Sequence, residues 1–268
     1  MNWIVFTDLD GTLLDARDYS FSEAQPGLNL LKTRKIPLIP CTSKTFAEVK
    51  EIRGNIHSDA PFIIENGSAV VFPKNYFGAA GMKLDTIRNF EAVVLGRPYA
   101  EIKNFLEEIV SRFNLKIRSF SQMDLSEIAL HSGLDEEQAS LAADRMFSEP
   151  FIAEEKIDNL DEIAFFAREN NLRLLIGNRF YHLLGRTDKG RAVQSLLSLY
   201  KQNFGGTYKS IGLGDGPNDI ELLLNVDYPV LVKRPPELSK KMPEISGMYY
   251  TKGTGPAGWS EAVRHLLK

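Results

Sequence analysis

The sequence predicts an α/β protein built on a doubly wound parallel sheet, and two observations lead to this prediction. Short apolar segments alternate with amphipathic segments over residues 1–83 and again over 187–268, and such alternation is typical of parallel βαβ units. Residues 84–186 follow a different order of strands and helices, with enough apolar positions to bury a core of their own. We therefore expect a Rossmann-like core domain over 1–83 and 187–268 that carries an inserted α/β domain over 84–186.

In the first part of the chain, each predicted strand ends where polar residues begin. The opening strand consists of aromatic and β-branched residues and leads into a charged loop. Thr45 and Glu48 form a capping box, which predicts the start of a helix. Asn66 and Gly67 between two apolar runs predict a hairpin. The predicted elements here are a strand at 3–6, a helix at 22–34, a strand at 36–41, a helix at 45–55, and strands at 61–64 and 69–72.

The rest of the chain is assigned by the same rules of periodicity, capping and turn chemistry. In the inserted domain we expect a strand at 90–96, a helix at 98–113, a strand at 115–120, helices at 126–132 and 135–147, a strand near 151, a helix at 158–170 and a hairpin at 172–185 that turns at 177–179. The core domain then resumes with a helix at 190–204, a strand at 210–214, a helix at 215–225, strands at 228–233 and 248–251, and a terminal helix from 259.

The composition narrows the class of protein. A chain of 268 residues, 43% hydrophobic and 25% charged, is typical of a globular protein with room for two domains. The net charge is -3 without any Lys/Arg-rich run, which argues against nucleic acid as the main partner. Cys41 is the only cysteine, and neither a signal peptide nor an apolar run long enough for a membrane helix is present. We expect a cytoplasmic protein without a membrane partner.

Two carboxylates directly follow the opening strand. Asp8 and Asp10 stand two residues apart at its carboxyl end, where open α/β sheets bind their ligands. Such a pair can hold a hard cation, attack an electrophile or transfer a proton. An EF-hand is excluded because Thr12 and Leu13 stand where an acid or amide and a glycine are required. A metal-binding Asp-x-Asp of a glycosyltransferase stays open on these residues alone.

Hydroxyl and lysine side chains stand at two other places, the end of a predicted strand and the start of a predicted helix. Thr42 comes directly after a strand, where its hydroxyl can donate to an anionic oxygen, and Lys44 adds a positive charge. The alternative is that this segment only caps the next helix, which Thr45 already does. Lys189 stands in a first helical turn, where the helix dipole disfavours a cation, so it is either exposed or faces an anion.

A late loop brings two further acids together. Residues 212–219 form a strand end, a tight turn and a helix start that carry Asp215 and Asp219. Pro217 stands where a dinucleotide-binding fingerprint needs glycine, and acids here suit a cation better than a pyrophosphate. The alternative is a capped helix with a well-formed turn. Residues 253–258 match G-x-G-x-x-G, but no βαβ unit follows them, so a turn is expected there.

In this set and order, the four segments resemble the motifs of the haloacid dehalogenase superfamily of Mg²⁺-dependent phosphotransferases, and the insert resembles its α/β cap. A finer resemblance, over nearly the whole chain, is to the mannosyl-3-phosphoglycerate phosphatase family. The segments that carry it are 40–45, 61–67, 147–151, 179–183 and 214–219. Gly216 departs from the family pattern, because serine is expected at this position in many members of the family.

The resemblance implies a phosphatase that acts through an aspartyl-phosphate. Asp8 would be the nucleophile and Asp10 the general acid and base. Thr42 and Lys189 would bind the phosphoryl oxygens. The implied Mg²⁺ ligands are Asp8, Asp215, the backbone carbonyl of Asp10, and Asp219 as the residue that orients the shell. The candidate substrate-binding residues are Thr42, Ser43, Lys44, Glu65, Asn66, Arg179 and His182.

The implied substrate is a small phosphorylated sugar-glycerate, mannosyl-3-phosphoglycerate. Within the superfamily, a glucosyl-3-phosphoglycerate phosphatase, a broader sugar-phosphate phosphatase and a phosphomutase stay open. From a different class, a catalytically silent sugar-phosphate-binding module stays open as well. A glycosyltransferase is disfavoured because it does not explain Lys189 or the loop with Asp215. The sequence gives no prediction of the oligomeric state.

Overall fold

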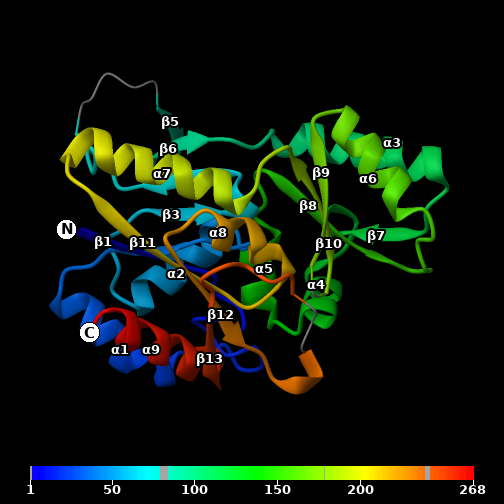
Figure 1. The fold of residues 1–268 in the computed structure, drawn as a ribbon. Helices are drawn as coiled ribbons and strands as arrows, with labels where there is room; N and C mark the ends of the chain where they lie inside the picture. The colour runs from blue at the N-terminus through cyan, green and yellow to red at the C-terminus, as the bar shows by residue number, and fades with distance from the viewer. Residues whose placement is uncertain (1, 79–83, 178, 239–241) are drawn as a thin grey trace.

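A computed structural model describes residues 2–78, 84–177, 179–238 and 242–268 of the chain (Figure 1). Its main sheet has five parallel strands in the order β13-β12-β11-β1-β2. The strands are β1 (Asn2–Thr7), β2 (Leu38–Pro40), β11 (Tyr208–Gly214), β12 (Tyr228–Lys233) and β13 (Tyr249–Thr254). The prediction of a parallel α/β sheet is confirmed, and all five carboxyl ends lie at one edge of the sheet.

A second, antiparallel sheet continues from the β2 side in the order β3-β4-β6-β5. Its strands are β3 (Phe62–Ile64), β4 (Ala69–Phe72), β5 (Asp85–Ile87) and β6 (Phe90–Val94). A bridge between Cys41 and Ile63 joins the two sheets, and the backbone N–H of Thr42 donates to the Ile63 carbonyl at 3.1 Å. The segment that follows β2 is therefore fixed on both sides.

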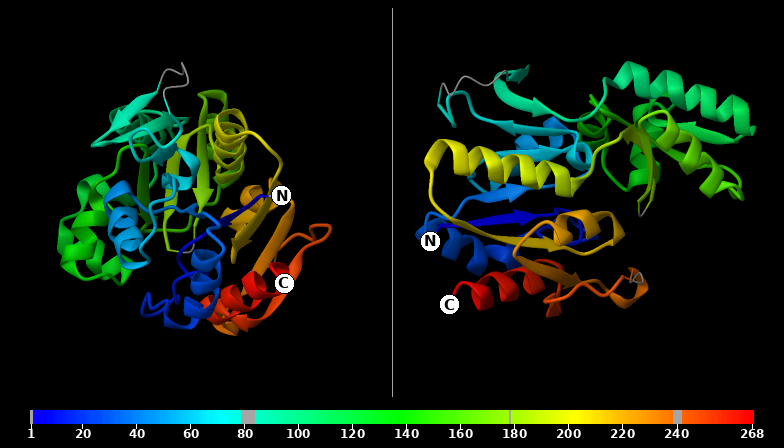
Figure 2. Two further views of the ribbon diagram at one scale, coloured as in Figure 1. Left: turned by 90° about the vertical axis from the view of Figure 1, so that its left-hand side faces the viewer. Right: turned by 45° about the horizontal axis from the view of Figure 1, so that its top comes forward.

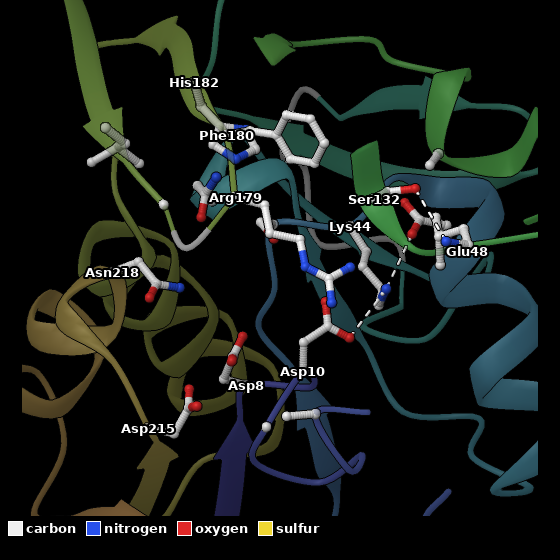
Figure 3. Close-up of a pocket in the computed structure, with 18 of the residues that line it drawn as sticks. Asp8, Asp10, Lys44, Glu48, Ser132, Arg179, Phe180, His182, Asp215 and Asn218 are labelled. Atoms are coloured by element: carbon white, nitrogen blue, oxygen red, sulfur yellow. Dashed lines mark hydrogen bonds and ion pairs between the residues drawn. The ribbon is translucent and has the colours of Figure 1, made fainter. Parts of the chain in front are cut away.

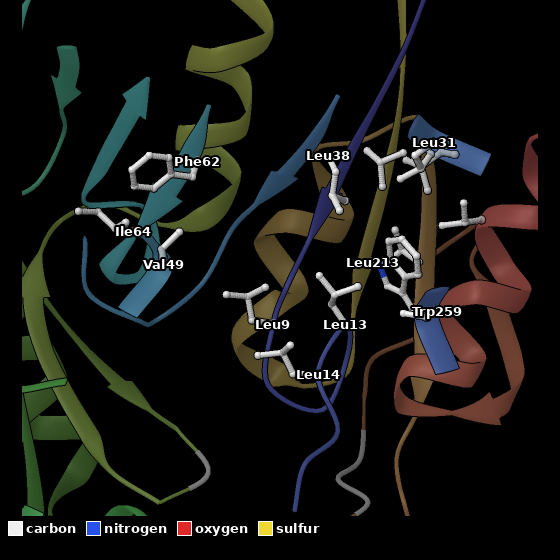
Figure 4. Packing of buried hydrophobic residues seen from close by; sticks show 14 of the residues in the cluster. Leu9, Leu13, Leu14, Leu31, Leu38, Val49, Phe62, Ile64, Leu213 and Trp259 are labelled. Atoms are coloured by element: carbon white, nitrogen blue, oxygen red, sulfur yellow. The ribbon is translucent and has the colours of Figure 1, made fainter. Parts of the chain in front are cut away.

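Helices cover both faces of the main sheet (Figure 1). They are α1 (Gln25–Thr33), α2 (Phe46–Asn55), α7 (Lys189–Phe204), α8 (Ile220–Leu224) and α9 (Gly255–Leu266). On the face of α1 and α9, Leu31, Leu213 and Trp259 pack together (Figure 4). On the opposite face, α7 packs against Phe6 and Ile39. The Trp259 indole also donates to Thr7 Oγ1 at 3.0 Å, which ties the terminal helix to the strand end before the first acids.

The remaining elements form a second lobe beside the core, which we call the cap (Figure 2). The cap consists of an antiparallel sheet in the order β7-β8-β10-β9 and four helices. Its elements are α3 (Tyr99–Phe113), β7 (Ile117–Ser119), α4 (Leu125–Ser132), α5 (Glu136–Ala143), β8 (Ser148–Ala153), α6 (Leu160–Glu169), β9 (Leu172–Ile176) and β10 (Tyr181–Gly185). Helices α3 and α6 share one apolar cluster with this sheet, and α4 and α5 form another around Phe120. The cap therefore has apolar clusters of its own.

Short 3₁₀ helices connect several elements. They are η1 (Ser22–Ala24), η2 (Glu65–Gly67), η3 (Phe120–Gln122), η4 (Pro217–Asp219) and η5 (Pro236–Leu238). The predicted capping box of α2 is confirmed, with Thr45 and Glu48 each accepting the other's backbone N–H. No helix among the described residues could span a membrane, because none combines the necessary length with enough apolar character.

Several boundaries differ from the sequence-based expectation. The strand predicted at 90–96 pairs with β4, with Val94 opposite Ala69, so residues 85–94 join the core-side sheet rather than the cap sheet. The domain bounds of 1–83, 84–186 and 187–268 stay a prediction. Residue 178 of the predicted turn lies outside the described part of the chain. The helix predicted at 135–147 ends at Ala143, because the next residues connect the cap to the core. The terminal helix begins at Gly255, so the G-x-G-x-x-G segment runs into its first turns.

Candidate active site

The carboxyl ends of four parallel strands place polar side chains at one edge of the main sheet. Asp8 directly follows β1, Thr42 follows β2, Asp215 follows β11 and Arg234 follows β12. All four of these residues are buried. Because neighbouring parallel strands end at the same level, four segments that are far apart in sequence meet in one buried cluster.

Three carboxylates form the centre of this cluster. One oxygen from each of Asp8, Asp215 and Asp219 lies within 4.8 Å of the other two, and all three residues are buried. The loop itself fixes Asp219, whose Oδ2 accepts from the backbone N–H groups of Asp215 at 3.0 Å and Gly216 at 3.1 Å. The arrangement matches the positions predicted from the first and the last motif. It concentrates negative charge where water is excluded.

Lys189 provides a buried counter-charge to two of these acids. Its Nζ donates to Asp8 Oδ1 at 2.7 Å and to Asp219 Oδ1 at 2.6 Å, and its side chain is 1% exposed. Of the two interpretations open for this lysine, the one in which it faces an anion is therefore observed. Burial lowers the pKa of Lys189, but Asp219 and Asp8 more than offset this effect and hold the pKa above its usual range. Lys189 is a permanent cation in the folded protein.

The acids remain electrostatically unbalanced despite this counter-charge. Burial raises the pKa of Asp8 well above its ordinary value, and the neighbouring Asp219 raises it further, although Lys189 acts in the opposite direction. Burial and Asp219 also raise the pKa of Asp215 to about 6. Buried carboxylates are stable as anions only when a cation or hydrogen-bond donors compensate for the lost hydration. The centre is therefore suited to a further positive charge.

The residues present fit a divalent cation that prefers oxygen ligands. Asp215 Oδ1 is buried and has no hydrogen-bond partner among the described residues. Mg²⁺ is bound in proteins by one or two carboxylates, with water or substrate oxygens completing an octahedron. Asp8, Asp215 and Asp219 could supply such ligands from within 4.8 Å of one another. Asp10 is outside this group of acids.

Asp10 instead faces the pocket beside Lys44 (Figure 3). Lys44 Nζ lies 3.1 Å from Asp10 Oδ1 and 3.2 Å from Glu48 Oε1. Glu48 is held in place because its Oε2 caps the backbone N–H of Thr45 at 2.9 Å. The capping box of α2 thus also positions the lysine that pairs with Asp10. The Asp10 side chain is 39% exposed, so it can exchange protons with a bound molecule or water.

A pocket of about 380 Å³ opens above these acids, between the core and the cap. The core contributes Asp8, Asp10, Ser43, Lys44, Asn66, Asp215 and Asn218 to its lining, and the cap contributes Phe120, Ser132, Arg145, Arg179, Phe180 and His182. Figure 3 shows Arg179 extending from the cap toward Asp10. Pockets of this size between domains are typical sites for small molecules. The lining includes both acids and cations, and Lys44, Arg145 and Arg179 could bind anionic groups of such a molecule.

The structure brings most, but not all, of the predicted substrate-binding residues to this pocket. Ser43, Lys44, Asn66, Arg179 and His182 line it. Thr42 is buried at the strand end, where its Oγ1 accepts from the backbone N–H of Lys44 at 3.2 Å.

Glu65, which was also predicted to bind substrate, is not among the residues that line the pocket. It is fully buried, and its carboxylate accepts from the Met146 and Phe147 N–H groups at 2.9 and 3.0 Å and from Ser148 Oγ at 2.6 Å. The expectation that Glu65 contacts substrate is therefore corrected. Its carboxylate fastens the segment between α5 and β8 to the core, and the sequence near Glu65 gives no sign of this distant partner.

Two arginines of the pocket were not found from the sequence. Arg145 donates from Nη1 to the Ser43 carbonyl and from Nε to the Ala142 carbonyl, both at 2.8 Å, so it joins the end of α5 to the loop after β2. Arg234 contacts Asp215. Nothing in the sequence around Arg145 predicts its position, because that position depends on how the cap docks. Arg234 could have been found, since it directly follows a predicted strand of the same parallel sheet.

His182 gives the pocket wall a testable pH dependence of stability. Its Nδ1 is buried, and burial, together with the positive charge of Arg145, lowers the His182 pKa to about 3 from the ordinary 6.5. Since the folded-state pKa is lowered, neutral His182 contributes stability that is fully present above about pH 6.5 and is lost as the pH falls toward 3. We expect His182→Asn to lose less thermal stability than the natural protein between about pH 7 and pH 4.

The measurement is the unfolding temperature of both proteins across this pH range. His57→Asn is the matched control, because His57 is an exposed histidine on the core surface. Carboxyl groups also titrate in this pH range, but their contribution to the pH dependence of stability cancels in the comparison between variant and natural protein. Identical slopes for His182→Asn and the natural protein would contradict the prediction.

The chain is similar to a known family, and to named proteins over nearly its whole length. The sequence model of the family described as haloacid dehalogenase-like hydrolase matches residues 5–94. A protein of Persephonella marina named glucosyl-3-phosphoglycerate/mannosyl-3-phosphoglycerate phosphatase is 41% identical over 98% of this chain and 97% of its own length. A protein of Methanococcoides burtonii with the same name is 36% identical over 100% of this chain and 98% of its own length.

Solved structures share the fold at lower identity. A haloacid dehalogenase-like hydrolase from B. subtilis superimposes with a TM-score of 0.68 at 16% identity, covering 98% of this chain and 99% of its own. The sucrose-phosphatase of Synechocystis, solved in complex with sucrose and phosphate, has a TM-score of 0.63 at 16% identity, covering 99% of this chain and 98% of its own. In both cases the similarity is one of fold, and it extends over nearly the whole length of the chain.

Proposed function

Because the chain belongs to the haloacid dehalogenase-like hydrolases, in the family of the glucosyl-3-phosphoglycerate/mannosyl-3-phosphoglycerate phosphatases, we propose that it is a Mg²⁺-dependent phosphatase of mannosyl-3-phosphoglycerate. It is a phosphoric monoester hydrolase, and the proposed products are mannosylglycerate and phosphate. The observation that carries the proposal is the meeting of three buried carboxylates and Lys189 beneath a pocket whose lining includes Lys44, Arg145 and Arg179.

The proposed reaction has two displacements at phosphorus. An oxygen of Asp8 attacks the phosphorus atom, the bond to the glycerate oxygen breaks, and Asp10 donates a proton to that leaving oxygen. Asp10 then takes a proton from a water molecule, whose oxygen attacks the aspartyl-phosphate and releases Asp8 and phosphate. The position of Asp8 at the strand end supports its role, because the strand leaves little freedom to this side chain. The exposure of Asp10 supports proton exchange.

Charge control at the phosphoryl group is shared among buried residues. Mg²⁺ held by Asp8 and Asp215, with Asp219 orienting its shell and the Asp10 carbonyl completing the protein ligands, would offset the repulsion between a carboxylate and a phosphate dianion. Lys189 and the hydroxyl of Thr42 bind the remaining phosphoryl oxygens, where negative charge must be stabilised. The hydrogen bond from Lys189 to Asp8 supports this role, because it holds the lysine ammonium group next to the carboxylate that attacks phosphorus.

The pocket lining supports a substrate that carries a second anionic group. Besides Lys44, the cap contributes the guanidinium groups of Arg145 and Arg179 to the lining. A glycosyl-phosphoglycerate has a carboxylate as well as a phosphate, and arginine is suited to carboxylates because its donors form a planar fork. Ser43, Asn66 and His182 supply the hydrogen-bonding groups for sugar hydroxyls in this proposal.

Phosphate release is the test of this function. With Mg²⁺ present, we expect strong preference for mannosyl-3-phosphoglycerate or its glucosyl counterpart over 3-phosphoglycerate and hexose phosphates, because only the first two combine a sugar with both a phosphate and a carboxylate. Removal of Mg²⁺ with EDTA is expected to abolish release. Equal rates across the panel would favour a broader sugar-phosphate phosphatase, and release that is unaffected by EDTA would contradict the metal.

Two alternatives are separated by the same assay. A phosphomutase would transfer the phosphoryl group to an added sugar acceptor, so excess acceptor would yield a new sugar phosphate in place of free phosphate. A silent binding module would release no phosphate from any member of the panel. The complete set of acids at the strand ends, with Lys189 in contact with two of them, favours the phosphatase.

A further inference from the structure

Arg234 makes a close contact with one of the proposed metal ligands. It follows β12, and its Nε donates to Asp215 Oδ2 at 2.6 Å, with both side chains less than 10% exposed. The same guanidinium donates from Nη1 to the Leu238 carbonyl at 3.3 Å. Arg234 is therefore held from two sides, and its orientation toward Asp215 is fixed by the loop that follows β12.

The other oxygen of Asp215 has a different environment. Asp215 Oδ1 is buried and has no hydrogen-bond partner among the described residues, whereas Oδ2 accepts from Arg234. A carboxylate with one oxygen occupied by a rigid donor cannot rotate freely. The unpartnered oxygen is thereby held in one orientation, and the Asp215 carboxylate belongs with Asp8 and Asp219 to the group of acids described above.

Gly216 makes room for this arrangement. A Cβ at position 216 would lie 2.3 Å from Arg234 Nη2 and 2.9 Å from Asn218 Oδ1. Any larger residue must displace the end of the arginine side chain, which is buried and hydrogen-bonded. Gly216, which follows Asp215, and Arg234, which follows β12, are thus structurally coupled although they lie in different segments of the chain.

We propose that Arg234 is a positioning residue for metal binding: it holds one oxygen of Asp215 so that the other is directed at the Mg²⁺. This inference rests on the proposed function, because Mg²⁺ is part of that function. Partners that orient metal ligands commonly change metal affinity by about 10-fold to 100-fold when they are removed. Arg234 contacts no reacting atom in this scheme and acts through Asp215.

The sign of the effect separates this role from simple charge repulsion. A guanidinium next to a cation site repels the cation, so electrostatics alone predicts that removing Arg234 tightens Mg²⁺ binding. Loss of orientation predicts the opposite. We expect Arg234→Met to weaken Mg²⁺ binding by about 10-fold or more, measured by isothermal titration calorimetry with Mg²⁺ alone. Arg234→Lys should recover part of the loss, because it retains the charge but not the planar fork.

Two further variants make the test specific. Lys233→Met removes an exposed cation from the adjacent position and should leave the Mg²⁺ affinity unchanged. Gly216→Ala keeps Arg234 but crowds its Nη2, and it should weaken Mg²⁺ binding in the same direction. In the Arg234→Met background, Gly216→Ala should add little, because residues that act through one contact are non-additive.

The outcomes distinguish the inference from the function on which it rests. Unchanged or tighter Mg²⁺ binding by a folded Arg234→Met protein overturns the inference, and so does a loss of thermal stability without any change in affinity. If Arg234→Met does not fold, normal Mg²⁺ affinity in Gly216→Ala overturns it instead. Failure of the natural protein itself to bind Mg²⁺ would overturn the metal in the proposed function, and the inference with it.

Discussion

We expect Asp8→Asn to lower Mg²⁺-dependent phosphate release from mannosyl-3-phosphoglycerate by at least about 1000-fold, the scale on which loss of a covalent nucleophile acts. The amide is nearly isosteric with the carboxylate but cannot form the acyl-phosphate. It also removes the charge that Lys189 contacts at 2.7 Å. The loss should appear in kcat, measured by release of inorganic phosphate under saturating substrate.

Asp18→Asn is the matched control for this variant. Asp18 is an exposed acid in the loop that follows the first motif, and its Oδ1 accepts the local N–H of Ser20 at 2.9 Å. The same chemical change there should leave kcat unaltered. Unchanged phosphate release by folded Asp8→Asn would contradict the nucleophile assignment, and trapping of a phosphorylated Asp8→Asn protein would show that another residue attacks phosphorus.

Most helices and strands could be predicted from the sequence, because the patterns that specify them involve residues close together in the chain. Alternation of apolar and polar segments located the parallel sheet, and the capping box at Thr45 located the start of α2. The exceptions depend on long-range pairing. Strand β6 lies within the insert predicted over 84–186, but its hydrogen bonds to β4 place it in the core-side sheet.

In the candidate site, too, some positions could be predicted from the sequence, whereas others depend on contacts between distant segments. Residues at the carboxyl ends of parallel strands, such as Asp8, Thr42 and Asp215, meet because neighbouring parallel strands end at the same edge of the sheet. Glu65 shares this position after β3, yet its carboxylate turns toward the Met146 and Phe147 N–H groups. That choice depends on where the cap connection docks, which no local pattern encodes. The roles of these residues in catalysis stay predictions that the variants above can test.

We expect Lys189→Met to reduce both activity and stability, and Mg²⁺ to recover part of the stability. In the natural protein one ammonium bridges Asp8 and Asp219 at 2.7 and 2.6 Å in a buried setting. Removing one partner of a buried ion pair leaves uncompensated charge and costs about 3–5 kcal/mol. Because Lys189 also binds the phosphoryl group in the proposed mechanism, kcat should fall by about 100-fold or more.

The response to Mg²⁺ tests whether the acids share one cation site. Without the lysine, Asp8 and Asp219 repel each other, so an ion that binds to the folded state alone should raise the unfolding temperature more in Lys189→Met than in the natural protein. Lys201→Met, an exposed lysine near the end of the same helix, should unfold like the natural protein with and without Mg²⁺. If Lys189→Met unfolds at the natural temperature in EDTA, or gains nothing from Mg²⁺, then the buried lysine does not compensate the acids that are proposed to hold the metal.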